Sequence, residues 1–252
     1  MIKSCYIDGR AFERDDFPNG VYVYQTIMTF GHQVLHLAAY MQLLDKASQE
    51  ILHRPSPLKT DELSSLISNF LRKYNYPTAM PAHVEVRLYH SGEVVLLGGE
   101  VSPYPQIGMR LVMPAGVDVI YDLPFSEQRS SLRRTAAEVA TLTAESRGAK
   151  VAVRFDTTGC ARSVDDAEIF IVEGYIITTS ATPTSVEGQL LAKAIIRAGL
   201  QLEIRDITPS LLDNADEIFY ADHRGITALG SYNQRPMMHI LAEKIAQHFQ
   251  TK

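Results

Sequence analysis

Cysteine is scarce in this sequence, tryptophan is absent, and no long apolar run occurs. The two cysteines, Cys5 and Cys160, lie far apart in the chain, which excludes a disulfide framework and favours a reducing, cytoplasmic location. No window approaches the roughly 18 apolar residues that a membrane-spanning helix needs, and the first residues lack the apolar segment of a secretion signal. We therefore expect neither secretion nor membrane insertion.

Positive charge is also in short supply. The 24 lysines and arginines are outnumbered by 29 aspartates and glutamates, which gives a net charge of −5. A chain of this charge does not attract a nucleic-acid backbone, so no nucleic-acid partner is expected. Hydrophobic residues make up 46% and charged residues 21% of the 252 positions, a composition that excludes intrinsic disorder and suffices for a full hydrophobic core.

Motifs for metal binding and for nucleophilic catalysis are missing as well. Only His32 and His36 have H-x-x-x-H spacing, and His32 falls in a predicted turn, so no metal site is expected. Ser130, His223 and Asp222 contain the residue types of a catalytic triad, but the sequence has no G-x-S-x-G nucleophile elbow. Neither chemistry is therefore favoured.

The N-terminal half combines strand and helix patterns. Runs of β-branched and aromatic residues predict strands, and apolar residues spaced by three and four positions predict helices. Strands are expected at 4–8, 10–13, 21–28, 83–89, 93–97 and 109–113, and helices from residue 37 and at 59–74. The first helix should bury Leu37, Met41, Leu44 and Ala47, and Thr60 is the candidate N-cap of the second.

The C-terminal half follows a strong turn signal. Pro114-Ala115-Gly116 predicts a linker at 114–118, between a smaller domain at 1–113 and a larger one at 119–252. In the second half, helices are expected at 131–147, 186–198, 209–215 and 237–249, and strands at 150–155, 167–172, 175–179, 201–206 and 217–221. Mixed elements in two blocks predict a two-domain α+β fold.

Five stretches in this order resemble the class IV aminotransferases, the fold-type IV pyridoxal-phosphate (PLP) enzymes that include branched-chain and D-amino-acid aminotransferases and aminodeoxychorismate lyase. They are YIDGRAF, VYQTIM, LLDKAS, FDTTGCARSVDDAEIFIVEGYIITT and ADEIF, and they span nearly the whole chain. The last two are similar to the family patterns D-x-x-G…E-x-x-x-x-N-I-F…G-x-L-x-T-P and ADEVF. The resemblance implies the D-amino-acid aminotransferase-like fold, with a cleft between two domains that a second subunit completes in a homodimer.

The same resemblance locates the residues that would hold PLP. The family's Schiff-base lysine maps to Arg129 or Ser130, and no lysine occurs between Lys73 and Lys150. The acidic residue that pairs with the pyridine nitrogen maps to Ser163, which cannot supply a counter-charge. Both groups that the cofactor chemistry requires are therefore replaced.

The positions that would contact the cofactor phosphate are replaced too. The phosphate-binding arginine maps to Gln42 or Leu43, and no arginine lies between Arg14 and Arg54. The turn at the helix N-terminus maps to 185–188, where the negative charge of Glu187 would repel the phosphate dianion of the cofactor. The threonine after the ADEVF strand maps to about His223. These changes all remove contacts to one small molecule, so we expect that no cofactor binds.

Basic residues remain near these positions. Arg129, Arg133 and Arg134 surround the position of the missing lysine, and His223 and Arg224 follow the ADEIF strand. If they face the family's cleft, they could bind a carboxylate or a phosphate. Alternatively, they are solvated, with Arg133 and Arg134 paired to Glu138 or another nearby carboxylate.

Two functions follow from this pattern. The first is a degenerate homologue, a pseudoenzyme without PLP that binds an anionic ligand or a protein partner. The second is an active PLP-dependent aminotransferase or aminodeoxychorismate-type lyase with a rearranged site, for which Lys150 and Lys193 are the candidates for a displaced Schiff-base lysine. The sequence leaves the ligand or substrate open in both cases.

Overall fold

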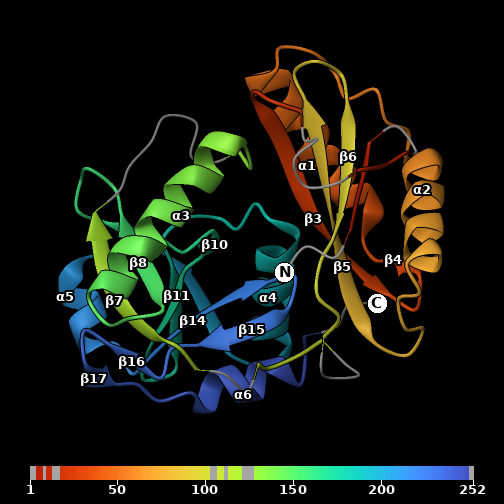
Figure 1. Cartoon of the computed structure of the whole chain (residues 1–252). Coiled ribbons are helices and arrows are strands. Elements are labelled where there is room, and N and C mark those ends of the chain that lie inside the picture. The colour runs from red at the N-terminus through yellow and green to blue at the C-terminus, as the bar shows by residue number, and fades with distance from the viewer. Residues whose placement is uncertain are drawn as a thin grey trace. The chain divides into compact units, whose positions relative to one another are not determined.

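The computed structural model describes residues 4–7, 10–12, 18–102, 107–110, 113–120 and 128–249. Their contacts divide the chain into two compact units (Figure 1). The N-terminal unit takes the described residues up to 102 together with 128–132, and the C-terminal unit takes the described residues at 107–120 and 133–249. Among the described residues, no helix is both long and apolar enough to cross a membrane.

The N-terminal unit is built on an antiparallel sheet with the strand order β2-β1-β6-β5-β3-β4. Its strands are β1 (Ser4–Ile7), β2 (Arg10–Phe12), β3 (Tyr22–Phe30), β4 (Gln33–Val34), β5 (Pro81–Tyr89) and β6 (Val94–Gly98). Phe70 of a helix packs against Gly98, where a Cβ atom would lie 2.9 Å from the ring. The strands expected in this half are confirmed, except the one at 109–113, where Met109 makes only an isolated bridge to Ile226 and 111–112 lie outside the described residues.

Two helices belong to this unit, α1 (Leu37–Ile51) and α2 (Thr60–Lys73). The buried face of α1 is rotated from the expected one, because Tyr40 and Ser48 are buried with Leu44 and Ala47. Thr60 is wrong as the N-cap of α2: the cap position is Lys59, whose side chain makes no capping hydrogen bond.

The C-terminal unit contains two sheets. One has the order β10-β9-β8-β7-β16-β17 and the other β13-β12-β11-β14-β15. The strands of the first are β7 (Ala115–Ile120), β8 (Val151–Phe155), β9 (Ala161–Val164), β10 (Ala167–Glu168), β16 (Ser231–Tyr232) and β17 (Arg235–Pro236). Those of the second are β11 (Phe170–Glu173), β12 (Ile176–Thr179), β13 (Gln201–Ile204), β14 (Glu217–Asp222) and β15 (Gly225–Ala228).

The two sheets enclose one core and are covered by helices on their other faces. Side chains of β8, β11 and β14 meet in a single buried cluster between the sheets. The helix α3 (Ser131–Ser146) buries Ala140 and Ala144 against β7 and β8 (Figure 1). The helices α4 (Val186–Arg197) and α6 (Ile240–Ala246) share a second cluster with the five-stranded sheet, and α5 (Pro209–Asn214) precedes β14.

Two differences from the predicted elements have a physical cause. The interval 114–118, predicted as a linker, overlaps β7, and Gly116 serves close packing, since a Cβ atom there would lie 2.6 Å from Leu229 Cδ1. The strand predicted at 167–172 divides at Ile169, because β10 pairs with β9 and β11 pairs with β12 and β14. Sequence periodicity does not reveal such a change of sheet.

Candidate functional site

A tight turn between β9 and β10 carries two aspartates. Val164 pairs with Ala167, which leaves Asp165 and Asp166 as the loop, and Asp165 has a φ of +50°. Aspartate tolerates this left-handed conformation better than most residues do. Oδ1 of Asp165 accepts hydrogen bonds from the Ala152 amide at 3.0 Å and from the Thr141 hydroxyl at 3.5 Å. The turn is thereby fixed to β8 and to α3.

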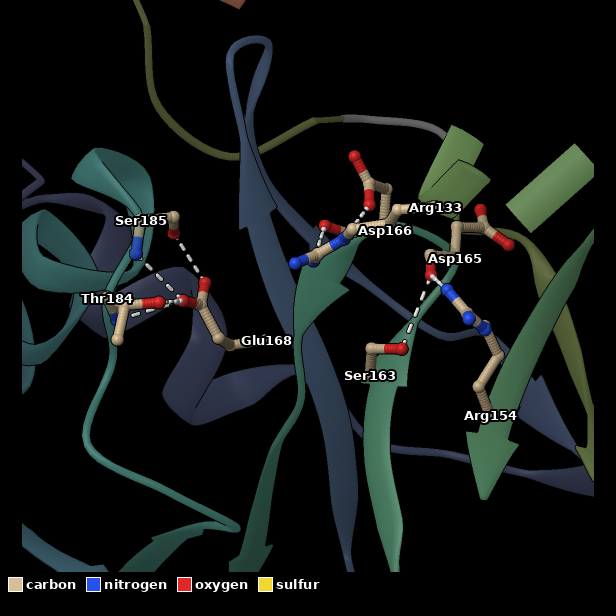
Figure 2. Close-up of polar contacts among 8 residues, drawn as sticks. All are labelled: Arg133, Arg154, Ser163, Asp165, Asp166, Glu168, Thr184 and Ser185. Atoms are coloured by element: carbon tan, nitrogen blue, oxygen red, sulfur yellow. Dashed lines mark hydrogen bonds and ion pairs between the residues drawn. The ribbon is translucent and has the colours of Figure 1, made fainter. Parts of the chain in front are cut away.

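Two arginines are held by this turn. Nη1 of Arg154, a 5% exposed residue of β8, donates to the Asp165 carbonyl at 3.1 Å. Nε of Arg133, in the first turn of α3, forms an ion pair with the Asp166 carboxylate, and its Nη2 donates to the Asp166 carbonyl at 2.9 Å. Figure 2 shows both guanidinium groups directed at the turn. Arg133 is therefore paired with a carboxylate, as one alternative expected, but the partner is Asp166 rather than Glu138.

Ser163, the position of the family's acidic residue, lies on β9 opposite Arg154. Its hydroxyl donates to the Asp165 carbonyl at 3.3 Å, so Ser163 and Arg154 share one acceptor (Figure 2). The serine thus stabilises the turn. Its neutral side chain adds no carboxylate beside Arg154.

A third arginine lies at the turn between β14 and β15. The backbone amide of Arg224 donates to Oδ1 of Asp222 at 2.8 Å, and its Nε donates to Oδ2 at 2.9 Å. Burial raises the pKa of Asp222, but the charges of His223 and Arg224 outweigh burial and hold this pKa well below its usual range. The Arg224 side chain remains 47% exposed. His223 and Arg224 therefore act together on Asp222.

Electrostatic interactions connect this turn to Asp165. The pKa of Asp165 is raised to about 6, mainly by burial and further by the negative charge of Asp222. The hydrogen bond from the Ala152 amide and the charge of Arg224 lower this pKa but offset the effect of burial only in part. Burial, Asp222 and Asp165 also raise the pKa of Tyr220. We refer to the group as the Asp165 cluster, which consists of Arg133, Arg154, Ser163, Asp165, Asp166, Asp222 and Arg224. It contains a carboxyl group whose pKa is raised to about 6 and a half-exposed guanidinium group.

The start of α4 is occupied by a glutamate of the chain itself. Oε1 of Glu168 accepts the amides of Thr184 at 3.0 Å and Ser185 at 2.9 Å, and Oε2 accepts the Ser185 hydroxyl (Figure 2). Ser185 is the N-cap of α4 and accepts the Gly188 amide at 3.0 Å. Glu187 lies in this first turn and is fully buried.

Sequence reasoning missed Glu168, although a signal was present. Glu168 stands at the asparagine of the E-x-x-x-x-N-I-F pattern, two residues before Phe170. This departure from the family pattern places a carboxylate beside the helix turn that the resemblance assigns to a phosphate. The negative charge expected at this turn thus comes from Glu168 as well as from Glu187.

The two positions assigned to the family's lysine lie in the N-terminal unit. The Arg129 carbonyl accepts the Tyr24 amide at 3.0 Å, and Ser130 forms an antiparallel bridge with Val23 of β3. Ser130 is only 2% exposed. Arg129 and Ser130 therefore extend the pairing of β3. Gln42 and Leu43, the positions assigned to the phosphate-binding arginine, lie on α1 in the same unit, whereas Arg133, Ser163, Glu187, His223 and Arg224 belong to the C-terminal unit.

The candidates for a displaced lysine are both on the surface. Lys150 precedes β8, and its amide donates to the Ala115 carbonyl at 2.8 Å. Lys193 lies on α4. Both side chains are exposed. In the described part of the chain, no group of three or more His, Cys, Asp or Glu side chains is placed to hold a metal ion.

A second polar group, not expected from the sequence, lies in the N-terminal unit. Nε of Arg87 on β5 pairs with Oε1 of Glu85 at 2.6 Å, and the Arg87 guanidinium lies 4.6 Å from the centre of the Tyr22 ring. The Tyr22 and Tyr89 rings are 5.0 Å apart. The alternation of these residues along β3 and β5 was the available signal, because it places them on one face of the sheet.

The motif ADEIF has a structural role in this fold. Oδ2 of Asp216 accepts the Gly174 amide at 2.8 Å, and the Glu217 carboxylate accepts the amides of Leu241 and Ala242 at 2.8 and 2.9 Å. Glu217 is 2% exposed and lies at the start of α6. The two acids therefore fix a hairpin and a helix around β14.

Comparison with known proteins shows what this geometry resembles. No model of a protein family matches the chain, and no curated protein matches it. Among solved structures, the branched-chain aminotransferase of Thermoproteus uzoniensis with norvaline has a TM-score of 0.81 at 17% identity, covering 99% of this chain and 94% of its own.

Two further structures contain a phosphopyridoxyl compound or PLP. The T.th. branched-chain amino acid aminotransferase complexed with N-(5'-phosphopyridoxyl)-L-glutamate has a TM-score of 0.79 at 13% identity, covering 99% of this chain and 93% of its own. A Brucella abortus aminotransferase bound to PLP has a TM-score of 0.80 at 15% identity, covering 98% of this chain and 96% of its own.

These similarities confirm the predicted fold and correct one expectation. The chain has the mixed α+β fold of the class IV aminotransferases over nearly its whole length. The expectation that no cofactor binds is contradicted, because proteins with this fold hold PLP or a phosphopyridoxyl group.

Proposed function

We propose that this chain, which has the class IV aminotransferase fold, binds a small anionic ligand at the Asp165 cluster. The observation that supports the proposal is that Arg133 and Arg154, from two separate elements, donate to one turn, while the charge of Arg224, in a second turn, acts on Asp165. The cluster has three aspartates, but Asp165 is half protonated near pH 6. Protonation of Asp165 removes one negative charge from the cluster, which favours an added carboxylate or phosphate.

Arg224 is the residue best placed to contact a ligand. Its hydrogen bonds to Asp222 use the backbone amide, Nε and Nη2, which leaves Nη1 without a partner among the described residues. The ion pair holds the guanidinium in one orientation, and the side chain is 47% exposed. A planar guanidinium held in this way can donate to an oxyanion without first giving up its carboxylate partner.

We further propose that the chain does not transaminate from the family's lysine position. Ser130 is buried in backbone pairing with β3, Arg129 adjoins it, and no lysine lies between Lys73 and Lys150. The site is degenerate in this sense, as in a pseudoenzyme. PLP remains a candidate ligand, because it carries a phosphate that arginine can bind.

A second candidate function is supported by the PLP groups in the similar structures. It is an active PLP-dependent aminotransferase or aminodeoxychorismate-type lyase in which Lys150 or Lys193 supplies the amine. Both lysines are exposed, so each is open to an aldehyde from solvent. In this function the protein's own groups would bind the phosphate and orient the ring, and the cofactor would act as the electron sink.

A titration separates the two functions. Inorganic phosphate and PLP are each titrated into the full chain by calorimetry, and the PLP sample is then treated with borohydride and its lysines are mapped by mass spectrometry. Phosphate binding with no reduced lysine supports the anion site. One stoichiometrically labelled lysine supports the second function, and the absence of binding by either ligand refutes both.

Two arginine variants test the location of the anion site. Arg224→Gln removes one charge-assisted interaction, so phosphate affinity should fall about tenfold. Arg205→Gln is the matched control, since Arg205 is 44% exposed and also paired with a carboxylate, that of Glu173. Equal phosphate affinities in the two variants would place the binding site elsewhere.

The assembly and the partners are proposed on the same basis. We propose a homodimer in the cytoplasm, from the resemblance and from the scarcity of cysteine. Light scattering on the purified chain tests the dimer. A protein that co-purifies and does not compete with phosphate would favour a protein partner over the anionic ligand.

A further inference from the structure

The segment that leads into β3 contains the Asn-Gly pair of this chain, Asn19 and Gly20. Both residues are exposed. Gly20 has a φ of +118°, and a Cβ atom built on it would meet nothing within 4 Å. Asn19 makes no hydrogen bond to any residue that the structure describes. The Asn19 amide is therefore free to move against the backbone of Gly20.

We propose that Asn19 is a site of spontaneous deamidation. The backbone nitrogen of Gly20 attacks Cγ of Asn19, the new N–Cγ bond forms, and the Cγ–Nδ2 bond breaks. Ammonia leaves with the proton of the Gly20 amide, and a five-membered imide remains. Water then adds to either imide carbonyl and reopens the ring to aspartate or isoaspartate at position 19. No oxidant, reductant or enzyme is required.

Glycine makes this position reactive for two reasons. It has no side chain to block the approach of its nitrogen, and it adopts the backbone conformations that ring closure requires. The Gly20 amide also makes no hydrogen bond within the described part of the chain, so the nucleophilic nitrogen is not held in a sheet or a helix.

The other asparagines lack this combination. Nδ2 of Asn214 donates to the Ser210 carbonyl at 2.8 Å, and Nδ2 of Asn233 donates to Oδ2 of Asp118 at 3.1 Å. Asn69 lies within α2, where the helix fixes the next amide, and Asn75 precedes the buried Tyr76. The structure therefore favours reaction at Asn19 over the other four positions.

The reaction would change the start of β3. The Val21 carbonyl accepts the His90 amide at 2.9 Å, and Tyr22 begins the pairing of β3 with β5. Isoaspartate inserts a carbon atom into the main chain two residues before Val21 and adds a negative charge. The hydrogen bond from His90 should therefore weaken first, ahead of the pairs further along the ladder.

The test follows the full chain during storage at mildly alkaline pH and physiological temperature. Peptide mass spectrometry locates deamidated residues, and labelling by an isoaspartyl methyltransferase counts isoaspartate. We expect first-order modification at position 19. The label on the peptide that contains position 19 should be lost in Asn19→Gln, which keeps Gly20 but has a side chain one carbon longer, so that ring closure would need a six-membered imide. If Asn19 stays unmodified in the folded chain while an unfolded peptide of the same local sequence deamidates, the proposal is overturned.

Hydrogen exchange tests the structural consequence. The His90 amide should exchange several-fold faster in aged wild-type protein than in fresh protein, and equally in aged and fresh Asn19→Gln. An aged sample with full modification and unchanged His90 exchange would refute the proposed effect on β3.

Discussion

The carboxylate of Glu217 should be among the largest single-residue contributions to the stability of the C-terminal unit. Glu217 lies on β14 with 2% exposure and accepts the amides of Leu241 and Ala242 at 2.8 and 2.9 Å. His239, the N-cap of α6, makes no side-chain capping bond. The first amides of α6 therefore depend on a strand residue that is 24 positions away from Leu241.

The magnitude follows from the two hydrogen bonds. A hydrogen bond to a charged group contributes about 1.5–3 kcal/mol, and a buried amide left without a partner costs a similar amount. Glu217→Gln keeps one acceptor oxygen and turns an NH2 group toward an amide, so it should lower the free energy of unfolding by about 2 kcal/mol. Glu217→Ala loses both acceptors and should lower it by about 3–5 kcal/mol.

Urea denaturation followed by circular dichroism measures these changes. Glu243→Gln is the matched control on the same helix, because its side chain is 58% exposed and its contact with His239 is a surface pair that contributes less than about 1 kcal/mol. Faster amide exchange in α6 should accompany the Glu217 variants. If Glu217→Gln and Glu243→Gln unfold at the same urea concentration, the capping argument is wrong.

Three further changes test other parts of the C-terminal unit. The pKa of Asp165 is raised from 3.8 to about 6, so the free energy of unfolding should be highest below the pKa of the unfolded state and should fall by at most about 3 kcal/mol as the pH rises through 6. Asp165→Asn should lack this fall. Parallel curves of stability against pH for the variant and the wild type would contradict the prediction. Gly116→Ala brings a Cβ atom within 2.6 Å of Leu229 and should cost about 1–3 kcal/mol in thermal unfolding, whereas Gly108→Ala, with nothing within 4 Å, should be nearly neutral. Ser185→Ala removes the N-cap of α4 and should cost about 1 kcal/mol by chemical denaturation; an unchanged midpoint would show that Glu168 alone holds this helix start.

Much of the fold could be predicted from the sequence because local patterns specify it. The apolar spacing that predicts α2 and the β-branched run that predicts β3 depend on neighbours within a few residues. The resemblance then supplied the topology, which the solved structures bear out. Gly116 was misread because glycine marks both turns and close packing, and only the position of Leu229 distinguishes the two.

The candidate site was less predictable, because its contacts join distant parts of the chain. Arg133 and Asp166 are 33 residues apart, and the sequence offered Glu138 as an equally good partner. Glu168 and Ser185 meet only because the end of β10 and the start of α4 lie at the same place. The raised pKa of Asp165 depends on burial, which single-sequence patterns do not specify. Residue types could be predicted here, but their pairing could not.

The change of sheet at Ile169 has a consequence for how the C-terminal unit unfolds. One fully buried residue separates β10 of the six-stranded sheet from β11 of the five-stranded sheet, and its side chain lies in the core between them. Neither sheet can therefore detach without pulling the Ile169 side chain out of the shared core. The connection between β10 and β11 is thus neither a hinge nor an exposed site for a protease. The two sheets should melt as one cooperative unit, so motions that serve ligand binding must arise in the turns around them.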